Sequence, residues 1–403
     1  MLLYVQHLLG IGHLKRAATL ANAMTSVGLD VTLVSGGPVV PDILVHAKRV
    51  VQLPPASAAD LSFKALVDDQ GNPVDDAWRQ KRRDLLLDVW RETKPHALVI
   101  ELFPFGRRQM RFELLPLLDA ARGGVHRPVV VSSVRDVLGG SQKDPARQNK
   151  MLELFEAYFD HLLVHGDPSL IAFDQTFPQA ARIAGKMHYT GYVVDCESLA
   201  EIAADVGRDE VIVSVGGGAV GRALIETAIL ARPLSMLADH HWRLLVGSNV
   251  ADAELAGIAA FVQNEGGENG LSNGQTRGLS HGLPMGITIE RNRSDFPALL
   301  ANCRLSISQG GYNTVMDILR AGARAVVVPF TGGIEVEQSV RARLLAQRGW
   351  IELLEETQLT PRALSDAIDR AAQSVPTAIG AVDLDGAQNS AALVAKWTSE
   401  LSW

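Results

Sequence analysis

Short apolar runs alternate along the chain with segments whose apolar residues recur every three or four positions. In 13–25, Leu14, Ala18 and Ala21 share one helical face, and Gly28 follows where a helix would end. This alternation is typical of βαβ units around a parallel sheet. Strands are predicted at 2–9, 31–34, 97–100, 128–132, 161–164, 186–189, 211–215, 242–246, 287–290, 305–307 and 325–328. Helices are predicted at 13–25, at 222–230, after Thr314, after Glu337 and at 389–401.

These elements form two series of similar size, and the break between them falls near 191–201. Two doubly wound α/β domains are therefore expected. A stretch rich in Gly and Asn at 264–282 interrupts the second series. Its composition is typical of a surface loop within a domain rather than of a linker.

Composition narrows the classes of function. The 403 residues carry 38 basic and 45 acidic side chains, and the net charge of −7 argues against electrostatic binding of nucleic acid. With only Cys196 and Cys303, the chain has no disulfide framework and no cysteine zinc site. No apolar run approaches the roughly 18 residues of a membrane span, and the start lacks the features of a secretory signal. We expect a cytoplasmic protein without a membrane span, and leave peripheral contact with a membrane open.

The first predicted strand leads into a glycine turn, Gly10-Ile11-Gly12-His13, that opens a helix. Glycines let backbone N–H groups approach a ligand, and a helix N-terminus favours anions. Lys15 stands where a dinucleotide fingerprint needs its third glycine, and the next strand ends without a carboxylate for a ribose. His13 is a candidate functional residue at the mouth of the sheet. The alternative is a histidine that bonds only to backbone at the helix start.

A second glycine turn, 216–221, does match G-x-G-x-x-G between a strand and a helix. The strand after it again ends without an acidic residue, which disfavours NAD. A turn that holds a phosphate of another ligand is the better interpretation, and a plain tight turn is the alternative.

The third turn, 308–314, places two glycines, Asn313 and Thr314 at a helix start, where free N–H groups and a hydroxyl can meet a phosphate. Asp317 follows one helical turn later, within reach of a ribose diol. Glu337 and Gln338 come after the next strand. Polar residues after neighbouring parallel strands converge on one crevice, so this set predicts a binding site. Ordinary helix caps and solvated charges explain each residue alone, but explain the set poorly.

Other motifs carry less weight. Asp383-Leu384-Asp385 has the form of a metal–nucleotide site but lies in a late loop. The basic segment 106–111 follows Phe103-Pro104-Phe105 and suits either an anionic acceptor, lipid head groups or a solvated helix start. The chain contains no G-x-x-x-x-G-K-[ST], H-E-x-x-H or G-x-S-x-G sequence. P-loop kinases, zincins and α/β-hydrolases are thereby excluded.

The turn at 10–13 and the segments 309–314, 329–330 and 337–338 resemble the GT-B glycosyltransferases. The similarity is greatest to family 28, typified by the N-acetylglucosaminyltransferase of the peptidoglycan lipid intermediate. Within it, 101–108, 215–218 and 310–314 resemble a bacterial group of predicted glycosyltransferases. The resemblance covers nearly the whole chain. It implies two Rossmann-like domains facing a central cleft, 1–192 on the acceptor side and 193–386 for the nucleotide sugar, with a C-terminal helix, 387–403, crossing back to the first.

The resemblance also implies roles for single residues. The donor phosphates would be held by Gly217, Gly218, Gly310, Gly311, Tyr312, Asn313 and Thr314. Asp317, in place of the family's usual glutamate, would bind the ribose, and Glu337 and Gln338 the donor sugar. His13 would activate the acceptor hydroxyl, with Gly10, Gly12, Arg107 and Arg108 on the acceptor-side loops.

The implied reaction moves a hexose from a nucleotide diphosphosugar, UDP-linked by weak preference, to an acceptor hydroxyl. It inverts the configuration at C1 and needs neither a metal nor a cofactor, since a histidine base and backbone N–H donors supply the chemistry. Two alternatives stay open: a GT-B-shaped nucleotide-sugar epimerase or hydrolase, and a relative that binds a nucleotide sugar or a partner protein without catalysis. An NAD-dependent oxidoreductase is the least favoured of these functions.

Overall fold

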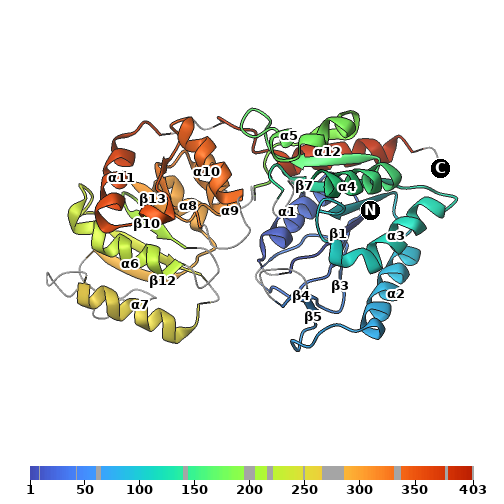
Figure 1. The fold of residues 1–403 in the computed structure, drawn as a ribbon, viewed down its shortest axis with the longest axis horizontal. Helices are drawn as coiled ribbons and strands as arrows, with labels where there is room; N and C mark the ends of the chain where they lie inside the picture. Colours follow the sequence, from blue (N-terminus) through green and yellow to red (C-terminus); the bar gives the residue numbers. More distant parts are fainter. Residues whose placement is uncertain are drawn as a thin grey trace. The chain divides into compact units, whose positions relative to one another are not determined.

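The computed structural model describes residues 1–8, 10–41, 43–59, 65–138, 144–194, 205–215, 221–247, 250–265, 286–330, 337–376 and 380–401. The chain divides into two compact units (Figure 1). Unit 1 contains Met1–Val194 and Val382–Trp403, and unit 2 contains Asp195–Ala381. Each unit is built on its own parallel sheet.

The described sheet of unit 1 is parallel throughout, with the strand order β3-β2-β1-β6-β7-β8-β9. Its strands are β1 (Leu2–Val5), β2 (Thr32–Ser35), β3 (Arg49–Gln52), β6 (Ala97–Glu101), β7 (Val129–Arg135), β8 (His161–His165) and β9 (Met187–Tyr189). The short β4 (Ser57–Ala58) and β5 (Leu66–Val67) form a separate antiparallel pair. The strand order reverses between β1 and β6, and ligands of such sheets bind at the carboxyl ends of the strands beside this switch point.

Successive residues of the central strands point to opposite faces of the sheet, as the strand period requires. Leu2 and Tyr4 pack with helices α2, α3 and α4, and Leu3 and Val5 pack with α1 and α12. The helices of the unit are α1 (Gly12–Ser26), α2 (Asp76–Thr93), α3 (Arg111–Gly123), α4 (Pro145–Tyr158), the single turn α5 (Phe173–Thr176) and α12 (Gly386–Ser399). Unit 1 is therefore doubly wound.

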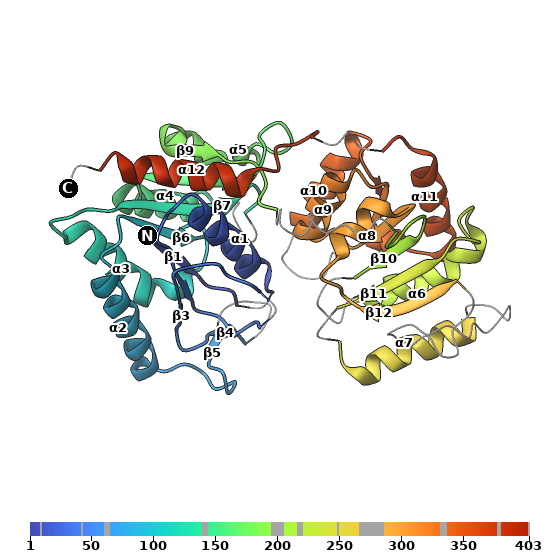
Figure 2. The same cartoon turned by 180° about the vertical axis from the view of Figure 1, so that it is seen from behind.

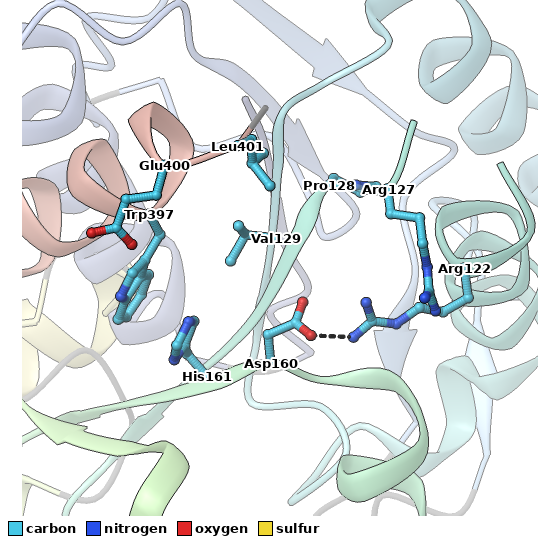
Figure 3. Close-up of a pocket in the computed structure, with 9 residues that line it drawn as sticks. All are labelled: Arg122, Arg127, Pro128, Val129, Asp160, His161, Trp397, Glu400 and Leu401. Carbon is cyan, nitrogen blue, oxygen red and sulfur yellow. Dashed lines mark hydrogen bonds and ion pairs between the residues drawn. The ribbon is translucent and has the colours of Figure 1, made fainter. Parts of the chain in front are cut away.

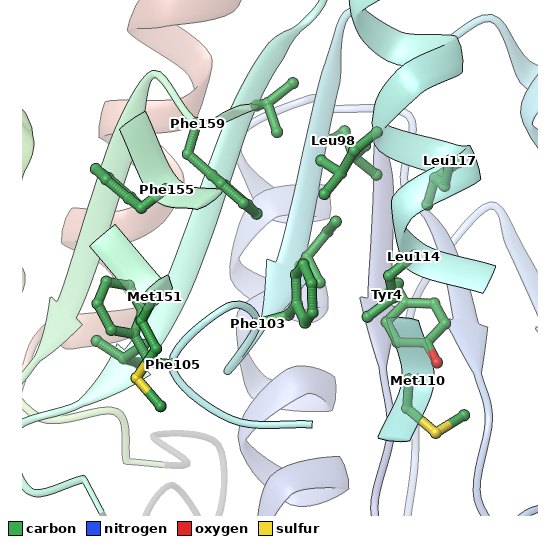
Figure 4. Close-up of a cluster of buried hydrophobic side chains, with 14 of the residues drawn as sticks. Tyr4, Leu98, Phe103, Phe105, Met110, Leu114, Leu117, Met151, Phe155 and Phe159 are labelled. Carbon is green, nitrogen blue, oxygen red and sulfur yellow. The ribbon is translucent and has the colours of Figure 1, made fainter. Parts of the chain in front are cut away.

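An aromatic cluster fills the core between the sheet and α4 (Figure 4). Phe103 and Phe105, each 1% exposed, enter it from the loop after β6. The Phe105 ring centroid lies 5.7 Å from that of Phe155 and 5.4 Å from that of Phe177. This packing fixes the loop that follows β6 at the switch point.

The C-terminal helix α12 packs on unit 1, alongside α1 (Figure 2). Trp397 near its end stacks on His161 of β8, with ring centroids 3.8 Å apart and planes 6° from parallel. His188 of β9 completes the contact, since its Nε2 lies 3.1 Å from Nδ1 of His161. The return of the last helix to the first unit agrees with the expectation from the sequence.

Unit 2 repeats the architecture, with the described strand order β12-β11-β10-β13-β14-β15 and parallel pairing throughout. Its strands are β10 (Val211–Ser214), β11 (Trp242–Val246), β12 (Ile287–Arg291), β13 (Leu305–Ser308), β14 (Ala325–Val327) and β15 (Glu352–Leu353). Its helices are α6 (Arg222–Ala231), α7 (Asp252–Glu265), α8 (Phe296–Asn302), α9 (Tyr312–Ala321), α10 (Glu337–Gln347) and α11 (Pro361–Gln373). The switch point lies between β10 and β13.

Two local differences from the sequence prediction have physical causes. The unpredicted strand β3 is an exposed edge strand, so it lacks the apolar pattern of the central strands. Helix α12 begins at Gly386 rather than 389, and a Cβ there would lie 2.4 Å from the Gly191 carbonyl oxygen. Because Gly386 has no side chain, the start of α12 can pack directly against the backbone at Gly191.

Replacing Trp397 by Ala should lower the free energy of unfolding of unit 1 by about 3–5 kcal/mol, because it removes a buried ring from the contact between α12 and β8. Urea unfolding followed by far-UV circular dichroism measures this. Lys396→Ala, whose side chain is 67% exposed on the same helix, is the control and should change little. Equal stability of the two variants would contradict the packing of α12.

Candidate functional site

Unit 1 brings a histidine, a carboxylate and a guanidinium together at its switch point. His13 is the second residue of α1, which follows β1, and Glu101 is the last residue of β6. His13 Nδ1 lies 2.7 Å from Oε1 of Glu101, and Arg16, one turn along α1, donates to the same oxygen. The exposed fraction of the side chain is 17% for His13, 3% for Arg16 and 1% for Glu101.

The protonation of this cluster follows from its surroundings. Burial would raise the pKa of Glu101, but the facing His13 and Arg16 outweigh it and hold that pKa below its usual range. Burial is the largest influence on His13 and lowers its pKa well below 6.5, so the imidazole is neutral near pH 7. An ionised carboxylate only accepts hydrogen bonds, so Nδ1 carries the hydrogen and Nε2 keeps its lone pair. That tautomer can accept a proton at Nε2.

The predicted acceptor-side residues lie in the turn after β1 and in the loop after β6. A Cβ on Gly10 or Gly12 would meet no atom within 4 Å, so the space beside the turn is open. The Arg107 backbone has φ +54°, uncommon for a side-chain-bearing residue, and its Nε donates to the Gln6 carbonyl at 2.7 Å. Arg108 is exposed at the start of a short 3₁₀ turn. These residues lie at the carboxyl edge of the sheet, where the sequence places them.

The predicted donor residues of unit 2 gather at its own switch point. Gly310 has φ +69°, and a Cβ there would lie 2.4 Å from a Val327 methyl carbon, so this position requires glycine. Gly311 caps α9 without a side-chain bond, and a Cβ there would meet nothing within 4 Å. The half-exposed Tyr312, Asn313 and Thr314 form the first turn of α9, whose N–H groups and dipole favour an anion. Gly217 and Gly218 lie outside the described residues.

The other donor-site predictions fall on α9 and α10. Asp317 is half-buried on α9, and the Gln338 side-chain oxygen accepts from the Phe330 N–H at 3.3 Å. Glu337 is 6% exposed, and its Oε1 accepts from Arg341 at 3.0 Å. The buried Arg341 guanidinium also lies 5.0 Å from the Tyr312 ring centroid. Glu337 thus helps to join α10 to α9.

Three residues of these clusters escaped the sequence analysis as site candidates: Arg16, Glu101 and Arg341. Arg16 and Arg341 follow their partners His13 and Glu337 at helical spacings of three and four residues, which is a local signal. Glu101 offers a weaker one, a carboxylate directly after the predicted strand 97–100. Its 88-residue separation from His13 is bridged only by the fold.

Two other parts of the described chain, a cavity beside α12 and the segment around Asp383, are less suited to be a catalytic or metal site. A cavity of about 330 Å³ in unit 1 lies between the end of α12 and the amino ends of β7 and β8, at the sheet edge opposite His13 (Figure 3). Its Asp160 is paired with Arg122 at 2.9 Å. Asp383, from the possible metal motif, accepts from the N–H of Asp385 and from Asn389, so it shapes the segment before α12. Among the described residues no group of three or more His, Cys, Asp or Glu side chains could hold a metal ion.

The part of the chain that the structure describes also contains no helix long and apolar enough to cross a membrane.

Known proteins are similar to this chain in two ways: solved structures share its fold, and a protein family matches the sequence of its second unit. Solved structures of the Acinetobacter baumannii MurG and of the spinosyn rhamnosyltransferase SpnG complexed with thymidine diphosphate each align along the chain. The first covers 98% of this chain and 99% of its own, with TM-score 0.61 and 16% identity. The second covers 99% and 96%, with TM-score 0.55 and 16% identity. The chain therefore has the GT-B fold, as predicted.

Residues 212–379 match the model of the glycosyltransferase family 28 C-terminal domain. A curated relative, the UDP-N-acetylglucosamine--N-acetylmuramyl-(pentapeptide) pyrophosphoryl-undecaprenol N-acetylglucosamine transferase of Rhodopseudomonas palustris (strain BisB18), is 26% identical over 190 residues. The match spans 45% of each chain, about half the length of that relative. Most of the second unit is therefore similar to the family 28 C-terminal domain, in agreement with the resemblance predicted from the sequence.

Replacing Arg16 by Met should lower the free energy of unfolding at pH 7 by about 3–5 kcal/mol, because it leaves the buried Glu101 carboxylate without its cation. The loss should be smaller at pH 3 than at pH 7, because the unfolded pKa of a glutamate is about 4.3. The folded-state pKa of Glu101 is depressed, so its contribution is present above the unfolded pKa and disappears on protonation. Urea unfolding at both pH values measures this.

The control for that variant is Arg83→Met, which removes an arginine whose ion pair with Asp84 is exposed and should cost no more than about 1 kcal/mol. Adding Glu101→Gln to Arg16→Met should recover part of the lost stability. A loss that is the same at both pH values would refute the charge pairing.

Proposed function

We propose that this protein is a glycosyltransferase that moves a hexose from a nucleotide diphosphosugar to an acceptor hydroxyl, with inversion at C1 and without a metal. The observation that carries the proposal is the pairing of His13 with Glu101 at the switch point of unit 1. A neutral histidine oriented by a carboxylate is the arrangement that a general base needs. The family 28 domain and the open α9 terminus support a donor site on unit 2.

In the proposed reaction, Nε2 of His13 takes the proton of the acceptor hydroxyl. The acceptor oxygen forms a bond to C1 of the sugar as the bond from C1 to the nucleotide diphosphate breaks, from the opposite face. Glu101 stabilises the imidazolium that results. The diphosphate leaves with the bonding electron pair, and its added negative charge is met by the first N–H groups of α9. The base returns its proton to solvent.

A UDP-sugar is the first donor to test, because the curated relative is named for UDP-N-acetylglucosamine. The spinosyn rhamnosyltransferase structure contains thymidine diphosphate, so a dTDP-sugar is the second donor to test. With two cysteines and no disulfide framework, a cytoplasmic location fits the proposal. An epimerase or hydrolase would take no acceptor, and analysis of the products distinguishes these reactions.

Donor binding should depend on the terminus of α9. UDP, dTDP, GDP and ADP are screened by thermal shift, in which a ligand at 100 times its Kd adds about 2.7 kcal/mol of stability. Gly311→Val should abolish the shift, since its side chain would fill the open space before α9. Asp317→Ala and Gln338→Ala, tested with the nucleotide sugar, should each weaken binding about fivefold.

Gly123→Val, another glycine whose Cβ would meet open space, is the matched control and should keep the full shift. Unchanged affinity in all three α9 and α10 variants would remove the donor-site assignment.

Catalysis should depend on His13. His13→Ala should lower kcat by about 10²–10⁴-fold, the usual contribution of a general base, and leave donor affinity nearly unchanged. Glu101→Gln should lower kcat less, because it keeps the imidazole but removes the charge that stabilises the imidazolium. Turnover and melting temperature are measured on the same preparation.

The control is His46→Ala, which removes an exposed histidine of the same unit. A His13→Ala variant that loses melting temperature but keeps its rate per folded molecule would make His13 a structural residue and refute the mechanism.

A further inference from the structure

Arginine side chains gather around His13 and Glu101. Three guanidinium groups, those of Arg16, Arg107 and Arg135, lie close enough to influence the pKa of His13 or Glu101. Arg16 donates a hydrogen bond to Glu101 and is its ion-pair partner. The nearby Asp136 carboxylate accepts from the Tyr192 hydroxyl at 2.7 Å and from the Val137 N–H.

Arg107 is the guanidinium that this argument singles out. Its Nε donates to the Gln6 carbonyl oxygen at the end of β1, and within the described ranges no carboxylate lies within ion-pair distance of its guanidinium. Burial is the largest influence on this group and lowers its pKa from 12.5. A partly desolvated cation without a counterion is costly, and a guanidinium offers two parallel donors that match a carboxylate or a phosphate.

The backbone holds Arg107 in this place. Leu102 and Arg107 both have positive φ, +65° and +54°, at the two ends of the loop, and such conformations cost energy unless the surroundings enforce them. The enforcement comes from Phe103 and Phe105, which are buried in the aromatic cluster (Figure 4). The guanidinium is therefore presented by a rigid loop rather than by a freely moving chain.

We propose that Arg107 binds an anionic group of the acceptor, a carboxylate or a phosphate, next to the hydroxyl that His13 deprotonates. The role of this anion as part of the acceptor rests on the proposed function. Binding of the anion at Arg107 does not, and it can be measured without any donor.

The test is titration calorimetry of the full chain with three probes: α-D-glucose 1-phosphate, D-glucuronate and the neutral methyl α-D-glucoside. At least one anionic probe should bind ten times or more tighter than the neutral sugar. The tighter of the two identifies the group as phosphate or carboxylate. Arg107→Ala should weaken that binding about ten- to a hundredfold, the usual worth of a charged hydrogen bond. Arg107→Lys should retain part of it, since it keeps the charge but not the paired donors.

Three further variants keep the test decisive. Arg107→Gly removes the guanidinium at a φ that glycine tolerates, so it should lose the anion even where the alanine variant is destabilised. Arg83→Ala removes an arginine elsewhere on unit 1 and should bind as the wild type does. In Gly311→Val, where the proposed donor phosphate site is filled, anion binding should persist.

Unchanged anion affinity in Arg107→Gly, equal loss in Arg83→Ala, or loss in Gly311→Val alone would overturn the assignment, as would failure of both anions to bind. A wild-type chain that binds the anion at Arg107 but transfers no sugar from any nucleotide donor would instead refute the proposed function and leave the anion site in place.

Discussion

A single buried carboxylate, that of Glu101, constrains the arrangement of unit 1. It stands at the last position of a central strand, 1% exposed, and its second oxygen has no hydrogen-bond partner in the described part of the chain. An unpaired charge in that position would cost several kcal/mol. Arg16 and His13 meet it through one oxygen, and both come from the first turns of α1. The start of α1 is thereby tied to the end of β6.

The rest of unit 1 holds α1 in the position that this pairing requires. One face of α1 packs on the sheet, and α12, the last helix of the chain, packs beside it through the same apolar cluster. Trp397 then anchors α12 to His161 of β8. The C-terminal helix thus supports the helix that carries His13, although the end of α1 at Ser26 and the start of α12 at Gly386 are far apart in sequence. The packing of α12 on unit 1 therefore helps to position the candidate base His13 as well as to stabilise the unit.

The sequence predicted what local patterns can encode. Apolar runs located most of the described strands, and helical spacing located α1, α6, α9, α10 and α12 but not the other described helices. The glycine turns after β1 and β13 pointed to His13 and to the start of α9. It missed Glu101 because a buried carboxylate at a strand end departs from the apolar pattern, and its partner lies 88 residues away. The resemblance assigned Glu337 to the donor sugar, and nothing in the sequence indicated that this side chain is buried and paired with Arg341. Pairing of buried charges depends on which elements become neighbours, and no local pattern contains that information.

Each of the two units contains a buried ion pair between an arginine and a carboxylate. In unit 1, Arg16 of α1 pairs with Glu101 at the end of β6, and in unit 2, Arg341 pairs with Glu337 four residues earlier in α10. The difference lies in the third group. In unit 1 the carboxylate also holds a partly exposed imidazole, whose other nitrogen remains available for chemistry. In unit 2 the arginine instead faces the ring of Tyr312 in the first turn of α9, whose N–H groups are the proposed phosphate donors. A buried ion pair therefore orients the proposed base in unit 1, and another orients the proposed phosphate-binding helix terminus in unit 2, as the proposed transfer reaction requires.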